Sequence, residues 1–359
     1  MVNSLYVTFD YLNPDSGAGK VCLHEINALS AVSDLEFVVS RGGNIGFKHQ
    51  VLNIDKVYPF NPFLYDYFVA DALSGTTDFM HLSCSPAVAI LEKVHPKKYV
   101  VNIVAHHLQT SIEEHERMFQ QPYPYAHNVD PYLHNVLLKH ARGADCVFTP
   151  SNHSKEWIIE NIKPKMVKVI PHGCDLPEKI PSSPAQFTVG YMGAFGPDKG
   201  LLYLLLAWEK LGWKDSKLVF AGPCCEYLEP WIKQFAPTSN IELVGWVKTP
   251  YEFFEKVSCV CVPSVSEGFG LLTLEAMAYG RVPVVTTGAG SSMIVENMTD
   301  GLVIPPRNPP AIMDALRHLK GDEDVLHLIM SKNARMTANK YTWDKVEGMY
   351  KEAYREIVG

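Results

Sequence analysis

The sequence predicts an α/β protein built from two doubly wound parallel-sheet domains in tandem. Short apolar runs with strand character alternate with helical patterns, and this alternation restarts after a proline-rich stretch at residues 171–186. A length of 359 residues allows each of two domains to bury its own core. Because parallel sheets bind ligands beyond the carboxyl ends of their strands, we expect a ligand in a central cleft that both domains face.

The first domain is predicted to cover residues 1–172 and begins with a strand at Leu5–Phe9. A turn-rich loop at Asn13–Gly19 leads into a helix whose apolar residues are Val21, Leu23, Ile26, Ala28 and Leu29. The run Tyr99–Ala105 is almost wholly apolar, which predicts a central strand. The other predicted strands are Leu35–Val39, Asp78–Leu82, Cys146–Thr149 and Val167–Ile170. Ser151 or Asn152 can cap the helix that starts near Lys155.

The second domain is predicted to cover residues 173–341. A glycine-containing loop at 193–200 precedes a helix at Leu201–Leu211, which ends at Gly212. The predicted strands are Phe187–Met192, Lys217–Ala221, Ile241–Leu243, Ser258–Val262 and Val282–Thr286. Residues 342–359 are expected to form an amphipathic helix, with an apolar stripe of Trp343, Val346, Tyr350, Ala353 and Ile357.

Composition and charge argue against several classes of protein. The net charge is −7, with 14 basic and 18 acidic residues up to Asp175 and 18 and 21 beyond it, so nucleic acid is not an expected partner. No apolar run approaches the ~20 residues of a membrane span, and the N-terminus lacks the pattern of a signal peptide. We therefore expect a cytoplasmic protein with eight reduced cysteines. Peripheral association with a membrane is compatible with this composition.

The histidines raise the question of a metal site. Twelve of the 14 lie at or before His172, and one stands among the carboxylates of Glu113–Glu116. None of these residues has the spacing of a closed zinc site, so no metal is predicted. The Asp-x-Asp pattern in Asp322–Asp324 is interpreted as the solvated start of a helix.

The most informative stretch is Pro263–Gly280, which follows an apolar strand. Its loop contains Gly268 and Gly270 and leads into a helix, and free N–H groups at a helix N-terminus attract anions. Glu267 and Glu275 bracket this junction, and carboxylates would repel an anion. They are better interpreted as acceptors for hydroxyl groups of the molecule that carries the phosphate, which predicts a nucleotide or a sugar phosphate as ligand.

From about Val169 to the C-terminus the chain resembles the retaining glycosyltransferases of family 4, which have the two-domain GT-B fold. The matching segments are Val169–Asp175, Tyr191–Gly200, Gly301–Val303 and the Glu-x7-Glu block from Pro263 to Val284. The final helix resembles the one that crosses back onto the first domain in such enzymes. The first half matches mainly in its layout.

The resemblance implies a role for each residue of the Glu-x7-Glu block. Glu275 would accept hydrogen bonds from the ribose hydroxyls, and Glu267 would hold the donor sugar and stabilise the positive charge of the transition state. Gly268 and Gly270 would permit close approach of the ligand. Backbone N–H groups of Phe269, Gly270 and Leu271 would bind the sugar or the diphosphate. The alternative for both glutamates is a solvent-facing or helix-capping role.

Outside this block the resemblance implies five further parts of a donor site. Lys199 and the Gly193 loop would bind the diphosphate, and the backbone around Trp246 and Val247 would contact the base. In the first domain, Gly17 and Gly19 would contact the diphosphate or the acceptor. His106, or alternatively His107, would contact the donor sugar.

The family usually has an arginine where this chain has Ala194. The change removes a phosphate clamp or moves it to another residue, and Arg281 is one candidate.

The function implied by the resemblance is transfer of a hexose, with retention, from a UDP- or GDP-linked donor to a hydroxyl acceptor. The acceptor would be a glycan, a lipid or a small molecule, and neither a metal ion nor another cofactor would be required. Two alternatives remain open. One is a sugar-nucleotide epimerase of the same fold, and the other is a degenerate, non-catalytic sugar-binding protein.

Overall fold

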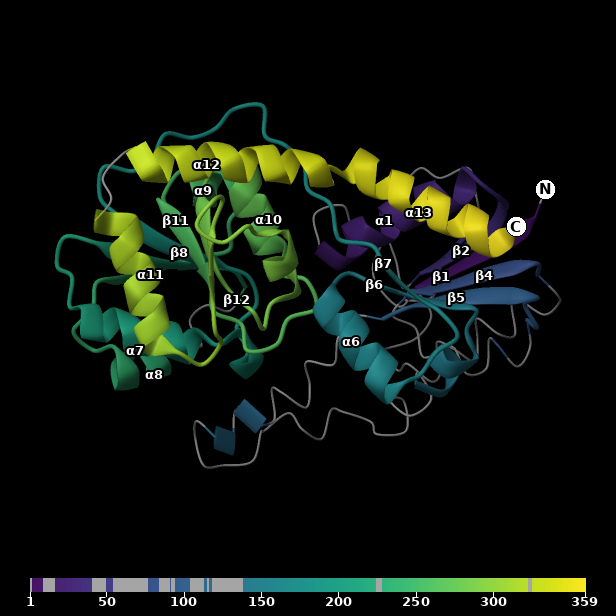
Figure 1. Ribbon diagram of the computed structural model, residues 1–359, viewed down its shortest axis with the longest axis horizontal. Coiled ribbons are helices and arrows are strands. Elements are labelled where there is room, and N and C mark those ends of the chain that lie inside the picture. The colour runs from purple at the N-terminus through teal and green to yellow at the C-terminus, as the bar shows by residue number, and fades with distance from the viewer. Residues whose placement is uncertain are drawn as a thin grey trace. The chain divides into compact units, whose positions relative to one another are not determined.

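The computed structural model describes residues 2–8, 17–40, 50–53, 77–83, 91, 94–103, 113–114, 116–117, 138–223, 228–321 and 325–359. The chain forms two compact units (Figure 1). The first contains residues 1–105, 127–173 and 343–359, and the second contains residues 106–126 and 174–342. The division differs from the expected domain bounds chiefly at residues 106–126, which group with the second unit.

The first unit is built on a seven-stranded sheet of order β3-β2-β1-β4-β5-β6-β7, in which every pairing is parallel. The order reverses between β1 and β4, which defines a doubly wound sheet. Tyr99 lies in β5, next to the middle strand, and β3 was not predicted. The strands are β1 (Asn3–Thr8), β2 (Asp34–Ser40), β3 (Gln50–Asn53), β4 (Phe79–Ser83), β5 (Lys98–Asn102), β6 (Cys146–Thr149) and β7 (Val167–Val169).

The helices described in this unit come from both ends of the chain and from its middle. They include α1 (Gly17–Ser30), α6 (Asn152–Asn161) and α13 (Trp343–Val358). Ser151 caps α6 by accepting a hydrogen bond from the Ser154 N–H, so α6 begins a few residues before the predicted start. All five residues of the predicted apolar stripe of α13 are buried and pack in one cluster with α1, which confirms the predicted helix.

The second unit contains a six-stranded parallel sheet of order β10-β9-β8-β11-β12-β13, which reverses between β8 and β11. Its strands are β8 (Thr188–Met192), β9 (Lys217–Ala221), β10 (Ile241–Gly245), β11 (Cys259–Val262), β12 (Val282–Thr286) and β13 (Leu302–Ile304). Its helices are α7 (Leu201–Leu211), α8 (Glu229–Phe235), α9 (Pro250–Phe254), α10 (Leu271–Ala278), α11 (Pro309–Gly321) and α12 (Val325–Ala338). In Figure 1, α7 and α11 cover one face of this sheet and α10 and α12 the other.

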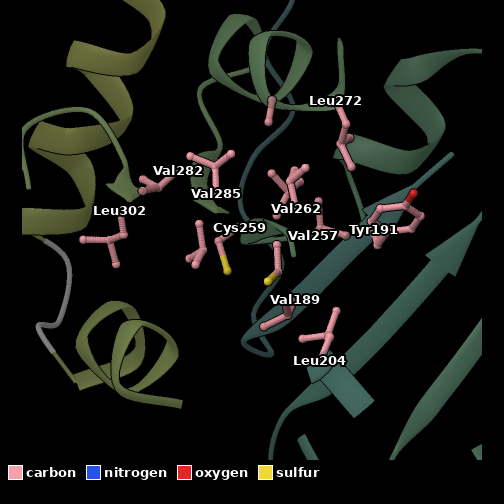
Figure 2. Packing of buried hydrophobic residues seen from close by; sticks show 14 of the residues in the cluster. Val189, Tyr191, Leu204, Val257, Cys259, Val262, Leu272, Val282, Val285 and Leu302 are labelled. Atoms are coloured by element: carbon pink, nitrogen blue, oxygen red, sulfur yellow. The ribbon is translucent and has the colours of Figure 1, made fainter. Parts of the chain in front are cut away.

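The core of the second unit forms between this sheet and its helices. Figure 2 shows Cys259 among valines of the neighbouring strands, with Leu204 and Leu272 from helices. Cys259 and Cys261 are fully buried, and burial raises the pKa of the Cys259 thiol to about 12, so both serve as small apolar side chains. Among the described cysteines all five are free thiols, whereas Cys84, Cys224 and Cys225 lie outside the described residues.

Candidate functional site

Two of the sequence motifs meet at the carboxyl edge of the second sheet. The loop after β8 and the loop after β11 start at neighbouring parallel strands. The Asp198 carbonyl accepts hydrogen bonds from the N–H groups of Val265 (2.7 Å) and Ser266 (3.4 Å). Gly200 has a left-handed backbone, with φ +66°, and a Cβ there would lie 2.1 Å from the Pro263 carbonyl oxygen. Glycine is therefore required for this close approach of the two loops.

Lys199 lies between two carboxylates at this junction. Its Nζ is 2.5 Å from a Glu267 carboxylate oxygen and 3.2 Å from an Asp198 oxygen. All three side chains are largely buried, with exposed fractions of 17% for Lys199, 21% for Glu267 and 8% for Asp198. Burial lowers the pKa of Lys199, but the two carboxylates outweigh it and the pKa is raised overall. Lys199 therefore remains a protonated ammonium in this site.

The position of the absent arginine is part of the same cluster. The Ala194 carbonyl accepts a hydrogen bond from the Tyr191 hydroxyl at 2.9 Å. Burial, together with the negative charges of Glu267 and Asp198, raises the pKa of Tyr191 well above its usual value. Tyr191 thus remains a neutral donor that fixes the loop after β8.

Arg281 does not replace the missing phosphate clamp, so that hypothesis is wrong. Its side chain is 3% exposed and donates to the Phe254 carbonyl at 3.0 Å. Its other donors bind the carbonyls of Pro181 and Ser182, each at 2.9 Å, and the Ser183 hydroxyl at 3.3 Å. The guanidinium therefore ties the linker segment to the end of α9 and has no donor directed at a ligand.

The loop of the Glu-x7-Glu block is fixed by its own backbone. Glu267 pairs with the segment after β12, donating its N–H to the Gly288 carbonyl (3.0 Å) and accepting from the Gly290 N–H (2.9 Å). The Phe269 side chain is buried in the core and Gly268 is buried beside it. Gly270 is the N-cap of α10, with φ +92° and no side-chain cap. The first turn of α10 therefore has no side-chain cap, and the anion site at this helix start stays a prediction.

Glu275 lies on the partly exposed side of α10. It follows Leu271 and precedes Tyr279 at intervals of four residues, and all other residues from Leu272 to Ala278 are buried. Five residues at ~1.5 Å each place Glu275 about 7.5 Å along the helix from Gly270. That distance fits a ribose attached to a diphosphate at the N-terminus of α10.

Three neighbouring strands of this sheet end in glycines with positive φ. They are Gly193 after β8, Gly222 after β9 and Gly245 at the end of β10, with φ of +148°, +140° and +75°. The Gly193 N–H donates to the Ala221 carbonyl (3.0 Å) and the Gly222 N–H donates to the Gly245 carbonyl (2.8 Å). A Cβ at Gly222 would lie 2.2 Å from the Gly193 carbonyl oxygen. Gly193, Gly222 and Gly245 therefore form an edge of the sheet without side chains, which is called the backbone shelf below.

An exposed tryptophan stands at the end of this shelf. Trp246 is 68% exposed, and Val247 after it is partly buried. Sequence reasoning identified Gly193, Trp246 and Val247 but missed Gly222. The signal that identifies Gly222 is its place directly after an apolar strand, which it shares with Gly193.

The predicted site residues of the first half are placed less completely. Gly17 and Gly19 lie in the first turn of α1, and Gly19 is buried, so they are helical rather than loop residues. A glycine pair at a helix start was mistaken for a loop because Asn13 to Gly19 is rich in turn residues. His106 and His107 lie outside the described residues, as do Asn13 to Ser16.

No metal site is found in the described part of the chain. Across these residues, no three histidine, cysteine, aspartate or glutamate side chains lie close enough to hold an ion. In the Glu113–Glu116 segment, Glu114 instead binds arginines. His115 and Asp322–Asp324 lie outside the described residues. Within the same described ranges, every helix is too short or too polar to cross a membrane.

Part of this chain is similar to a known protein family. Residues 186–322 match the family model of the glycosyl transferases group 1. An uncharacterized glycosyltransferase of Methanocaldococcus jannaschii is 30% identical over 161 residues, which are 44% of this chain and 41% of the relative. A second one from the same organism is 27% identical over 219 residues, or 60% of each chain. The chain thus spans about half the length of these relatives.

Solved structures show the fold. Sucrose-phosphate synthase from Thermosynechococcus elongatus has a TM-score of 0.76 at 16% identity, over 99% of this chain and 98% of that one. Anabaena HepE, solved with UDP and glucose, has a TM-score of 0.74 at 15% identity, over 99% and 100%. WaaG, a glycosyltransferase involved in lipopolysaccharide biosynthesis, has a TM-score of 0.70 at 13% identity, over the same shares. The chain has the GT-B fold, and its residues 186–322 are similar in sequence to the group 1 glycosyltransferases.

Proposed function

We propose that this protein is a glycosyltransferase that moves a sugar from a nucleotide diphosphate sugar to a hydroxyl acceptor. The observation that carries the proposal is the Lys199–Glu267 pair, held where the loops after β8 and β11 meet and beside the uncapped start of α10. A cation and free backbone donors fit a diphosphate, and a carboxylate next to them fits sugar hydroxyls. The Anabaena and Staphylococcus aureus neighbours solved with UDP are consistent with such a donor.

Donor binding would exchange the partners of the Lys199 ammonium. Without a ligand, Lys199 is neutralised by Glu267 and Asp198. A diphosphate that enters offers Lys199 competing acceptors, so Glu267 becomes free to accept hydrogen bonds from the sugar. The ammonium and the first turn of α10 would then stabilise the charge that develops on the leaving diphosphate.

The remainder of the donor would extend along the same edge of the sheet. Glu275 would accept hydrogen bonds from the ribose hydroxyls. The base would lie against the backbone of Gly193, Gly222 and Gly245, where the absence of side chains permits close approach. Trp246 and Val247 would border that position, and uridine or guanosine would be the nucleoside.

We propose retention of configuration, by transfer on one face of the sugar. The bond from the anomeric carbon to the diphosphate oxygen breaks, and the acceptor oxygen bonds to the same face. The acceptor proton passes to the leaving phosphate oxygen, so no protein nucleophile or metal ion is required. His106, or alternatively His107, would contact the donor sugar.

The acceptor is proposed to be a glycan or a lipid-linked glycan. Relatives include CapM of Staphylococcus aureus, which is a capsular polysaccharide biosynthesis glycosyltransferase. Another is a lipopolysaccharide 1,2-N-acetylglucosaminetransferase of Salmonella typhimurium. Acceptors of this kind would bring the protein to a membrane surface as a peripheral partner.

A thermal-shift screen of UDP-, GDP- and ADP-sugars tests the donor class. A ligand that binds only the folded state raises the melting temperature. At a ligand concentration of 100 times its Kd, the free energy of unfolding increases by about 2.7 kcal/mol. We expect one nucleotide series to raise it, and Lys199→Ala to abolish the shift. Lys217→Ala is the matched control, because Lys217 forms a comparable pair with Glu242 (2.8 Å) on the surface. A lack of response to all three series would contradict the proposal.

Product analysis separates the enzyme classes. Incubation of the responding donor with mixed glycan acceptors should release free nucleoside diphosphate and a glycosylated product. Recovery of an isomerised sugar nucleotide would identify an epimerase instead, and binding without turnover would identify a sugar-binding protein.

A further inference from the structure

A short segment from the first half of the sequence belongs to the second unit. Within residues 106–126, the structure describes Glu113, Glu114, Glu116 and Arg117, all in helical conformation. The Glu114 side chain is 1% exposed, which is unusual for a carboxylate and requires compensation by charged or polar donors.

Three donors surround the Glu114 carboxylate. One oxygen accepts from the Arg307 Nε at 2.7 Å. The other accepts from the Tyr203 hydroxyl at 2.7 Å and from the Arg117 guanidinium at 2.9 Å. The Arg117 guanidinium also stands 5.4 Å above the centre of the Tyr203 ring. Glu114 therefore joins three segments that are far apart in the sequence.

Two of these partners lie next to the candidate donor site. Tyr203 is in the first turn of α7, where its N–H donates to the Gly200 carbonyl at 3.0 Å, and Gly200 directly follows Lys199. The ideal Cβ position of Gly200 is 3.5 Å from the Tyr203 ring. Arg307 follows β13 at the same edge of the sheet and has a left-handed backbone, with φ +57°. A non-glycine residue in that conformation requires support from its surroundings.

We propose that Glu114 is a positioning residue for the donor site. It fixes Tyr203 and Arg307, and through the first turn of α7 it holds the loop that presents Lys199 to the diphosphate. The inference rests on the proposed function. It adds that a segment of the first half of the sequence sets the geometry of the site in the second unit.

The exposure of the Glu114 partners indicates that removing Glu114 changes the structure only near the donor site. Arg307 and Arg117 are 40% and 50% exposed, so both guanidinium groups can be hydrated when Glu114 is removed. Tyr203 is only 7% exposed, and its hydroxyl would lose a charged acceptor inside the unit. The expected consequence is displacement of α7's first turn rather than unfolding of the domain.

The test is a comparison of Glu114→Gln and Tyr203→Phe with wild type. We expect both variants to raise the donor KM about tenfold or more while kcat for the bound donor changes less than threefold. Glu242→Gln, in the surface pair with Lys217, is the control and should change neither constant. In a double-mutant cycle, Glu114→Gln with Tyr203→Phe should cost no more than the larger single effect.

Three outcomes distinguish the possible failures. Unchanged donor KM in both variants, with only a lower melting temperature, would show that Glu114 is purely structural and would overturn the inference. If Glu114→Gln does not fold, Tyr203→Phe carries the test alone, since it keeps the ring in place. If wild-type protein binds no nucleotide sugar in the thermal-shift screen, the proposed function fails first, and the inference fails with it.

Discussion

Lys199 and Glu267 form an ion pair, and their opposite charges would act in opposite ways on a diphosphate in the proposed donor site. Lys199 attracts it, whereas Glu267 repels it and competes for the ammonium at 2.5 Å. In the proposed reaction, the same carboxylate would stabilise positive charge on the sugar in the transition state. A substitution that removes only the negative charge of Glu267 should therefore separate binding from catalysis.

We expect Glu267→Gln to lower kcat on the order of 100-fold without weakening the binding of the free nucleoside diphosphate. Affinity for the diphosphate should stay equal or increase a few-fold, because Lys199 loses its nearer competing acceptor. Calorimetry with UDP or GDP and steady-state kinetics measure the two effects. Glu229→Gln, in an exposed pair 3.9 Å from Lys233, is the control. Weaker nucleotide binding by Glu267→Gln would contradict this division of roles.

Helix α7 shows how a single element positions the site. It begins after Gly200 and ends before Gly212, and both glycines are left-handed caps, with φ of +66° and +59°. They differ in what surrounds them. A Cβ at Gly200 would lie 2.1 Å from the Pro263 carbonyl oxygen, whereas at Gly212 its nearest neighbour would be 4.0 Å away.

This pair of caps provides a matched test of packing. Gly212→Ala incurs only the cost of a left-handed alanine, about 1 to 2 kcal/mol. Gly200→Ala incurs the same cost and must also separate the two loops, so we expect about 3 kcal/mol or more in total. Urea unfolding measures both. Gly200→Ala should also weaken nucleotide binding, and equal unfolding costs for the two variants would show that the loops do not depend on this contact.

The sequence predicted the bounds of some elements and missed other elements entirely. The bounds of α7, β6, β9 and β12 were confirmed, because apolar runs end there at clear turn or cap residues. Strand β3 was missed because Gln50 and Asn53 leave it only two apolar residues. Strand β13 was missed because its three residues show no period, although β7, which is as short, was predicted. In the candidate site, Lys199, Glu267 and Gly270 could be identified from the motifs. Asp198, Tyr191 and Glu114 could not, since their roles depend on contacts between distant segments.

Across the whole chain, its two ends are joined by a buried polar network in the first unit. Glu25 of α1 is fully buried and accepts hydrogen bonds from the side chains of Tyr6, Asn102 and Tyr350. The Glu25 oxygen that accepts from Tyr6 lies 3.6 Å from the His81 Nε2, and the His81 Nδ1 is 2.6 Å from the Tyr354 hydroxyl. The network therefore links β1, α1, β4 and β5 to the C-terminal helix α13.

The two titrating groups of this network shift in opposite directions. Burial raises the pKa of Glu25 from 4.5 to about 7, against the lowering effect of its hydrogen bonds. Burial lowers the pKa of His81 from 6.5 to about 3. Burial also raises the pKa of the nearby Tyr6, Tyr350 and Tyr354, so these remain neutral at acidic and neutral pH. Between about pH 3 and about pH 7 the folded state keeps Glu25 protonated and His81 neutral.

The contribution of this pair to stability should be independent of pH between 4.5 and 6.5. Glu25 contributes stability that is present below pH 4.5 and lost as the pH rises to about 7. His81 contributes stability that is present above pH 6.5 and lost as the pH falls to about 3. Between the two ordinary values, folded and unfolded states each hold one proton on the pair, so the opposite slopes cancel.

Single substitutions should expose the two slopes with opposite signs. Glu25→Gln leaves His81 uncompensated, so the free energy of unfolding should fall by about 3 kcal/mol between pH 6.5 and 4.5, relative to wild type. His81→Asn leaves Glu25 uncompensated. The free energy of unfolding of this variant should therefore fall by a similar amount as the pH rises from 4.5 to 6.5, relative to wild type. Urea unfolding at both pH values, each referred to wild type, removes the contribution of all other groups. Slopes of the same sign in the two variants would show that the pKa shifts of Glu25 and His81 do not offset each other.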